Sequence, residues 1–106
     1  MDLVYEVYRL VKRLPKEELY ALSSQIRRSV VSVPSNIAEG QQRKSTREFI
    51  QFLSIARGSV AELQTQLLIC VGLNYLAEND ISGAMQLTVE INKMLNSIII
   101  KLQNLH

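Results

Sequence analysis

Residues 45–70 read STREFIQFLSIARGSVAELQTQLLIC, and this stretch decides the fold. Ser45 and Glu48 have the spacing of a capping box, in which the serine hydroxyl accepts a hydrogen bond from the glutamate backbone N–H and the glutamate carboxylate reaches back. After this start, apolar residues recur at alternating steps of four and three: Phe49, Leu53, Ala56, Val60, Leu63, Leu67 and Cys70. Such a seam is typical of a helix packed against partner helices. The stretch predicts a long helix that ends at Asn74, because asparagine tolerates the left-handed conformation.

Three further segments have helical spacing. The first runs from about Asp2 to about Arg13, and Pro15 after it can end one helix and serve as the first residue of the next. The second continues to about Gly40 through Pro34, where the lost backbone hydrogen bond predicts a kink, with two separate helices as the alternative. The third occupies residues from about 78 to 105. Their apolar stripes are Leu3, Val7, Leu10 and Leu14; Leu19, Leu22, Ile26, Val30, Val33 and Ile37; and Ile81, Ala84, Ile91, Leu95, Ile98 and Leu102, with Thr88 in the missing position of the last.

No segment alternates with the period of two that a half-buried strand shows, so the fold class is all-α. Four amphipathic helices joined by short connections predict an up-down-up-down antiparallel four-helix bundle with its second helix kinked at Pro34. A chain of 106 residues with 47% hydrophobic content is long enough for one domain, residues 1–106, and too short for two separate cores.

The composition excludes most enzyme chemistry. One cysteine, Cys70, and one histidine, His106, provide neither a disulfide, a zinc site nor a Cys/His nucleophile pair. No carboxylate falls on a seam, so a di-iron bundle is excluded as well. We therefore expect no catalytic residues, no metal and no other cofactor. The acidic start of the chain and the short longest apolar run, residues 67–73, indicate a cytoplasmic protein without a membrane span.

Apolar surface exceeds what one subunit can bury. The predicted helix of residues 2–13 is about half as long as the predicted helix that begins at Ser45 and ends at Asn74. Part of the apolar seam of the longer helix therefore lacks a neighbour. Ile98, Ile99 and Ile100 cover about 200° of helix surface and cannot all face one interior. We interpret these three isoleucines as a subunit interface, with one or two exposed isoleucines as the alternative.

The net charge of +2 conceals an asymmetry. Residues 9–57 carry ten basic and four acidic side chains, a net charge of +6, and the remainder carries −4. The helix that ends near Gly40 and the helix that begins at Ser45 form a hairpin with its midpoint near Gln42. Arg27 and Arg28 should then lie level with Arg57. Arg43, Lys44 and Arg47 cluster at the turn, beside a helix N-terminus that favours anions. We predict that six cations bind nucleic acid, mainly through phosphates: Arg27, Arg28, Arg43, Lys44, Arg47 and Arg57. The alternative is a solvated face whose cations pair with nearby glutamates.

The sequence resembles a known family along essentially its whole length. The residues that carry the resemblance are 25–40, QIRRSVVSVPSNIAEG, then Arg43, Ser45, Glu48, Phe49, Phe52, Leu53, Ile55, Ala56, Gly58 and Ser59, and 62–67, ELQTQL. They are similar to the four-helix-bundle proteins encoded by intervening sequences of bacterial 23S ribosomal RNA genes. The family includes the accessory variability determinant of diversity-generating retroelements, a basic bundle that works beside a reverse transcriptase.

The resemblance implies a ring-shaped homopentamer, a positive face for RNA or DNA, a kink at Pro34 and a reverse transcriptase as a possible partner. Its matching positions of interest are Arg27, Arg28, Asn36, Glu39, Arg43 and Gly58, of which Gly58 would let two helices approach closely. Family members usually have residues before the position of Asp2, and commonly glycine at the position of Asn74. The sequence therefore predicts a non-catalytic, oligomeric bundle that presents cations to nucleic acid, and the resemblance adds an accessory role beside a nucleic-acid-processing enzyme. The alternative is a protein-interaction scaffold without nucleic-acid binding.

Overall fold

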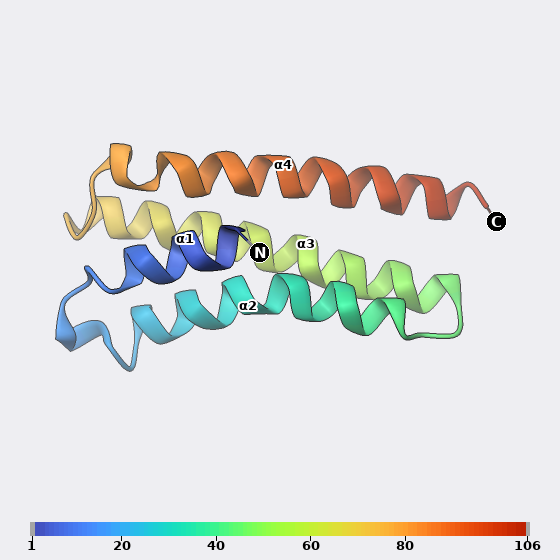
Figure 1. Cartoon of the computed structure of the whole chain (residues 1–106), viewed down its shortest axis with the longest axis horizontal. Helices are drawn as coiled ribbons and strands as arrows, with labels where there is room; N and C mark the ends of the chain where they lie inside the picture. The colour runs from blue at the N-terminus through green and yellow to red at the C-terminus, as the bar shows by residue number, and fades with distance from the viewer. Residues whose placement is uncertain (1, 106) are drawn as a thin grey trace.

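The computed structural model describes residues 2–105, so Met1 and His106 lie outside it. Its elements are α1 (Asp2–Val11), the short 3₁₀ helix η1 (Lys16–Glu18), α2 (Leu22–Gln41), α3 (Thr46–Gly72) and α4 (Glu78–Gln103), with no strand among the described residues (Figure 1). Each α-helix packs against the next along the chain, and α4 packs back against α1. The predicted all-α four-helix bundle is confirmed.

Both ends of α3 follow the local signals of the sequence. Ser45 has extended backbone, and its hydroxyl accepts the Glu48 N–H at 3.1 Å, as an N-cap should. The Ser45 hydroxyl also lies 3.4 Å from a Glu48 carboxylate oxygen, to which it can donate, so the carboxylate contacts the serine side chain. At the other end, Asn74 has a φ of 63°, the left-handed conformation that was predicted to stop the helix.

The predicted start of α2 is wrong. Pro15 does not open α2; it precedes η1, and α2 begins at Leu22. Ala21 has a non-helical backbone, with φ −121° and ψ −102°, and separates the two helices. Glu18 holds η1 in place, because its carboxylate accepts the Tyr75 hydroxyl at 2.8 Å and the Leu22 N–H at 3.4 Å. As a result Leu19, expected on the buried stripe, is 44% exposed.

Pro34 lies inside α2, which continues through it as one helix from Leu22 to Gln41. Two separate helices, the alternative interpretation, are therefore excluded. The Asn36 side-chain amide donates to the backbone carbonyl and to the hydroxyl of Ser32, each at 2.8 Å. These bonds reinforce the turn of α2 that contains the proline.

Gly40 is buried inside the last turn of α2, where it packs against α3. A Cβ at this position would lie 2.8 Å from Cδ1 of Phe49 and 2.8 Å from Cβ of Phe52. Glycine is thus required here by close helix packing, in addition to its predicted place at a helix end.

The core consists of two clusters, and only one of them includes α1. The first joins α1 residues such as Leu3 and Val7 to Ile26 and Leu67. The second contains residues of α2, α3 and α4 alone: Val33, Leu53, Ala56, Val60, Leu95 and Ile99, with the half-buried Ile37, Phe49, Ile50, Ile91 and Leu102 packed against them. Figure 1 shows the reason, because α1 runs beside only one half of the bundle. One half of the molecule is therefore a four-helix core and the other a three-helix core.

Candidate nucleic-acid interface and self-association surface

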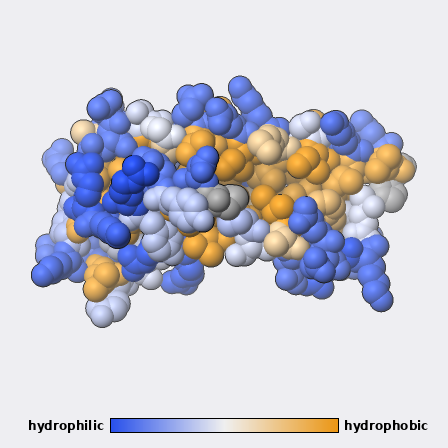
Figure 2. All heavy atoms as spheres, viewed as in Figure 1, coloured by the Kyte–Doolittle hydropathy of each residue, from blue (hydrophilic) through white to orange (hydrophobic). Residues whose placement is uncertain are grey.

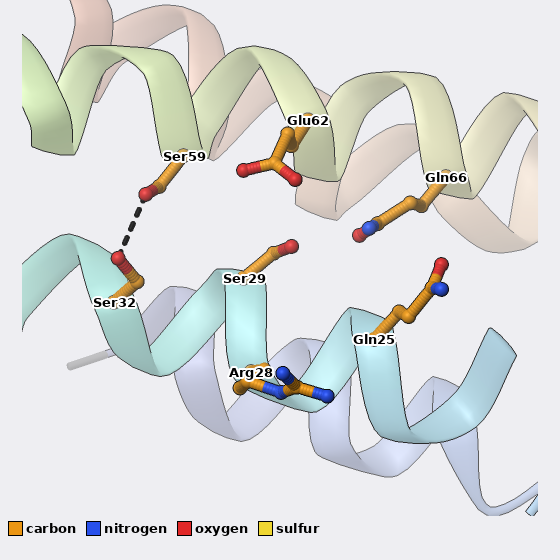
Figure 3. A pocket seen from close by; sticks show the side chains of 7 residues that line it. All are labelled: Gln25, Arg28, Ser29, Ser32, Ser59, Glu62 and Gln66. Carbon is orange, nitrogen blue, oxygen red and sulfur yellow. Dashed lines mark hydrogen bonds between the residues drawn. The ribbon is translucent and has the colours of Figure 1, made fainter. Parts of the chain in front are cut away.

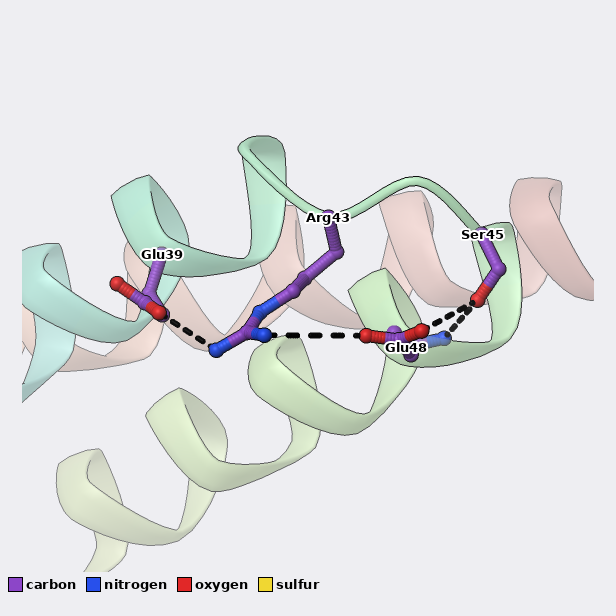
Figure 4. Close-up of polar contacts among 4 residues, drawn as sticks. All are labelled: Glu39, Arg43, Ser45 and Glu48. Atoms are coloured by element: carbon purple, nitrogen blue, oxygen red, sulfur yellow. Dashed lines mark hydrogen bonds and ion pairs between the residues drawn. The ribbon is translucent and has the colours of Figure 1, made fainter.

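Arg43 is tied into the turn between α2 and α3. Its guanidinium lies 2.6 Å from a Glu39 carboxylate oxygen and 4.0 Å from one of Glu48, as Figure 4 shows. It also lies over the Phe52 ring, 4.8 Å from the centroid. These contacts neutralise Arg43 and give it a structural role at the turn.

Lys44 and Arg47, on the same turn, have no carboxylate within 4.0 Å among residues 2–105. Arg47 lines a recess with Ile50 and with Gln103 of α4, so it lies on the α4 side of α3. With Arg43 neutralised, these two cations carry the positive charge of the turn.

Arg28 and Arg57 are not level, contrary to the prediction. The hydroxyls of Ser32 and Ser59 bond at 2.8 Å, which places Arg28 opposite Glu62, and both line one groove. Arg57 instead donates to Oδ1 of Asn96 on α4 at 2.8 Å. The reason is that the hairpin midpoint lies beyond Gln42, since residues 42–45 connect the helices and α3 begins only at Thr46.

A polar groove of about 420 Å³ lies on the surface between α2 and α3 (Figure 3). All its lining residues are hydrophilic: Gln25, Arg28, Ser29, Ser32, Ser59, Glu62 and Gln66. Gln66 is 9% exposed, and its buried Oε1 has no hydrogen-bond partner within the described chain. Only Arg28 of the six predicted cations reaches this groove.

Arg27 lies on the other side of α2, next to α1 and η1. There it lines a pocket with Lys12 and Lys16, two cations that were not predicted to lie beside it. The spacing of Lys12 and Lys16 on either side of Pro15 was the available signal. It was missed because α2 was expected to begin at Pro15, which sends the two lysines to different helices.

The three isoleucines divide between core and surface. Ile99 is 4% exposed and belongs to the three-helix core, so its assignment to a subunit interface is wrong. Ile98 and Ile100 are 37% and 56% exposed. They lie about 200° apart around α4, so they face different directions. The buried seam of α4 passes through Ile99 where Ile98 was expected.

Ile98 belongs to an apolar face that α1 leaves uncovered. It shares one side of α4 with Ile91 and Leu102, seven residues before it and four after it. We call these three residues of α4, together with the half-buried Ile37 of α2 that packs on the three-helix core, the open face. Figure 2 shows apolar side chains gathered on the half of the molecule beyond α1. Patches of this kind mark interaction surfaces.

Two polar contacts close the end of the bundle opposite the α2–α3 turn. Arg13 pairs with Asp80 at 3.0 Å, and the Ala77 backbone N–H donates to the same carboxylate at 2.8 Å. The Ala77 N–H and, secondarily, Arg13 lower the pKa of Asp80.

The pKa values of two further groups are shifted. The hydrogen bond to Glu18 raises the pKa of Tyr75. Burial raises the pKa of the Cys70 thiol, which lies in the core as predicted.

None of the helices between Asp2 and Leu105 has the length and hydropathy of a membrane span. Over the same residues, no three His, Cys, Asp or Glu side chains are grouped as metal ligands.

Comparison with known proteins identifies the family. The family model described as 23S rRNA-intervening sequence protein matches residues 1–97. A solved structure of a protein of unknown function, from the S23 ribosomal protein family of Bacteroides thetaiotaomicron, is 31% identical. The match covers 92% of this chain and 95% of that one, with a TM-score of 0.80. No curated protein matches the chain. This chain therefore belongs to the 23S rRNA-intervening sequence protein family.

Proposed function

We propose that the protein is a non-catalytic, self-associating bundle that binds RNA or DNA through phosphate contacts. The observation that carries the proposal is the division of its charges. Arg9, Arg13 and Arg43 form ion pairs with acids. Arg27, Arg28, Lys44, Arg47 and Arg57 have no carboxylate within 4.0 Å among residues 2–105. Five of the six predicted cations thus have no carboxylate partner within the described residues and are available to an anionic partner.

The cations are spread over several sides of the bundle. Arg27 lies beside α1, Arg28 at the polar groove, Arg57 beside α4, and Lys44 and Arg47 at the turn. A single subunit would therefore touch few phosphates at once, and its affinity would be weak. An oligomer repeats each cation around its axis, and simultaneous contacts raise the overall affinity.

Self-association is supported by the open face. In the three-helix half, Ile37, Ile91 and Leu102 remain only half-buried, and Ile98 is exposed. A second copy would remove this apolar surface from water, at about 25 cal/mol for each Å². The resemblance makes a pentameric ring the expected assembly.

Salt-dependent binding tests the nucleic-acid proposal. A structured RNA and a duplex DNA are titrated at about 50 and 200 mM salt, since a protein that neutralises Z phosphates of duplex DNA shows a slope of about −0.9Z. Lys44→Glu/Arg47→Glu should weaken binding tenfold or more at the lower salt. The matched control is Lys93→Glu/Lys101→Glu, an equal charge change on α4 that should have a smaller effect. Equal effects, or no binding at low salt, would overturn the proposal.

A protein-interaction scaffold is the second candidate function. It is favoured by the neutralisation of Arg43 and by the separation of the remaining cations. The reverse transcriptase implied by the resemblance would be such a partner. Co-purification with that enzyme, together with no nucleic-acid binding at about 50 mM salt, would support this candidate over the first.

A further inference from the structure

A pocket of about 300 Å³ lies between the end of α1, η1 and the start of α2. Val11 and Leu14, which are 5% and 9% exposed, contribute apolar wall. Ser23, at 3% exposed, contributes a hydroxyl. Tyr8 and Leu19 also line the pocket and are 37% and 44% exposed, so they lie toward solvent. The pocket thus has an apolar interior with one small polar group, the usual composition of a ligand site.

Three cations line the same pocket: Lys12, Lys16 and Arg27. None of them has a carboxylate within 4.0 Å in the part of the chain between residues 2 and 105. The Arg27 guanidinium donates to the Leu19 carbonyl at 3.4 Å, which holds it beside η1. Glu18 is engaged by Tyr75 and Leu22, and the exposed Glu17 can offset one positive charge. The rim therefore remains positive.

We propose that this pocket takes one unpaired base of a single-stranded nucleic acid, with the neighbouring phosphates on Lys12, Lys16 and Arg27. The inference rests on the proposed nucleic-acid binding and names the contact. An occupant must combine a body that fits an apolar recess with a negative charge next to it, and a nucleotide does both. The Tyr8 ring offers a face for stacking, which every base can use. The Ser23 hydroxyl can donate to or accept from the edge of the base.

Abasic strands separate base insertion from phosphate contact. Fluorescence anisotropy compares a labelled single strand of about ten nucleotides with a strand of equal length that carries abasic sites throughout. Both have the same phosphates, so they differ only in the presence of bases. The wild-type protein should bind the base-bearing strand at least fivefold more tightly, because stacking on one aromatic ring contributes about that factor or more.

Tyr8→Ala should remove this preference and leave the affinity for the abasic strand unchanged. Tyr5→Ala is the matched control, because Tyr5 lies three residues earlier on α1, is 68% exposed and does not line the pocket. Circular dichroism checks that both variants fold. Equal wild-type affinity for the two strands, or equal losses on both strands in Tyr8→Ala, would overturn the inference while nucleic-acid binding stands. No binding of either strand at low salt would overturn both proposals.

Discussion

The hydroxyl oxygens of Ser32 and Ser59 lie 2.8 Å apart and join α2 to α3 near the middle of the bundle. Ser32 also accepts hydrogen bonds from the Asn36 amide, on its backbone carbonyl and its hydroxyl. The pair sets which residues of the hairpin face each other, and it lies at one end of the polar groove. Replacing one hydroxyl therefore tests how much this polar contact stabilises the hairpin.

We expect Ser59→Ala to lower the free energy of unfolding by about 1 kcal/mol, the usual net value of one hydrogen bond. Ser54→Ala is the control, because Ser54 is half-buried on the same helix and makes none of the side-chain bonds found among residues 2–105. Urea denaturation followed by circular dichroism measures both. Equal effects of the two substitutions would contradict a stabilising role for the pair.

Gly40→Ala and Gly58→Ala should have opposite effects. A Cβ on Gly40 would meet Phe49 and Phe52 at 2.8 Å, and overpacking of this kind costs about 1–3 kcal/mol. Gly58 has no atom within 4 Å of the corresponding position, contrary to the close approach expected there. Its replacement should stabilise α3 by about 0.5–1 kcal/mol through helix propensity. Thermal denaturation shows whether each substitution raises or lowers the melting temperature. A lower melting temperature for Gly58→Ala would contradict the open space found around the Cβ position of residue 58.

Substitutions along residues 98–100 should separate folding from association. Ile99→Ala should cost about 2–5 kcal/mol, because it leaves a cavity in the three-helix core. Ile98→Glu should leave the fold intact and shift the protein toward monomer, since it charges the open face. Ile100→Glu, on another side of α4, is the control for charge. Sedimentation velocity measures the oligomeric state of each variant. A monomeric wild-type protein at micromolar concentration would contradict the role of the open face in self-association.

Acid should weaken the Asp80 end of the bundle. The pKa of Asp80 is lowered from its ordinary value of 3.8, first by the Ala77 N–H and then by Arg13. The stabilisation from this carboxylate is therefore fully present above its unfolded-state pKa and is lost as the pH falls through the folded-state pKa. Asp80→Asn should show a smaller fall in melting temperature between about pH 5 and 2. Identical acid profiles for wild-type and variant protein would exclude this contribution.

Local sequence signals predicted the helices well. The cap at Ser45 and the stop at Asn74 act through bonds and backbone angles within a few residues, so they can be read without the fold. The start of α2 could not, because Glu18 holds η1 through Tyr75, a residue 57 positions away. The buried seam of α4 was predicted at Ile98 and lies at Ile99. Apolar periodicity does not distinguish between these two adjacent isoleucines, and only the packing of α4 against the other helices shows which one is buried.

The amino-acid sequence by itself determined four amphipathic helices, their antiparallel order and an excess of cations in the first half of the chain. Only the tertiary structure decided which cations pair with carboxylates, which share a surface and where the apolar face is uncovered. Helix formation depends on neighbours three and four residues apart, whereas the partners of Arg43, Arg57 and Arg27 depend on the register between helices. That register comes from side-chain packing at contacts such as Gly40 against Phe49 and Phe52, which no local pattern encodes.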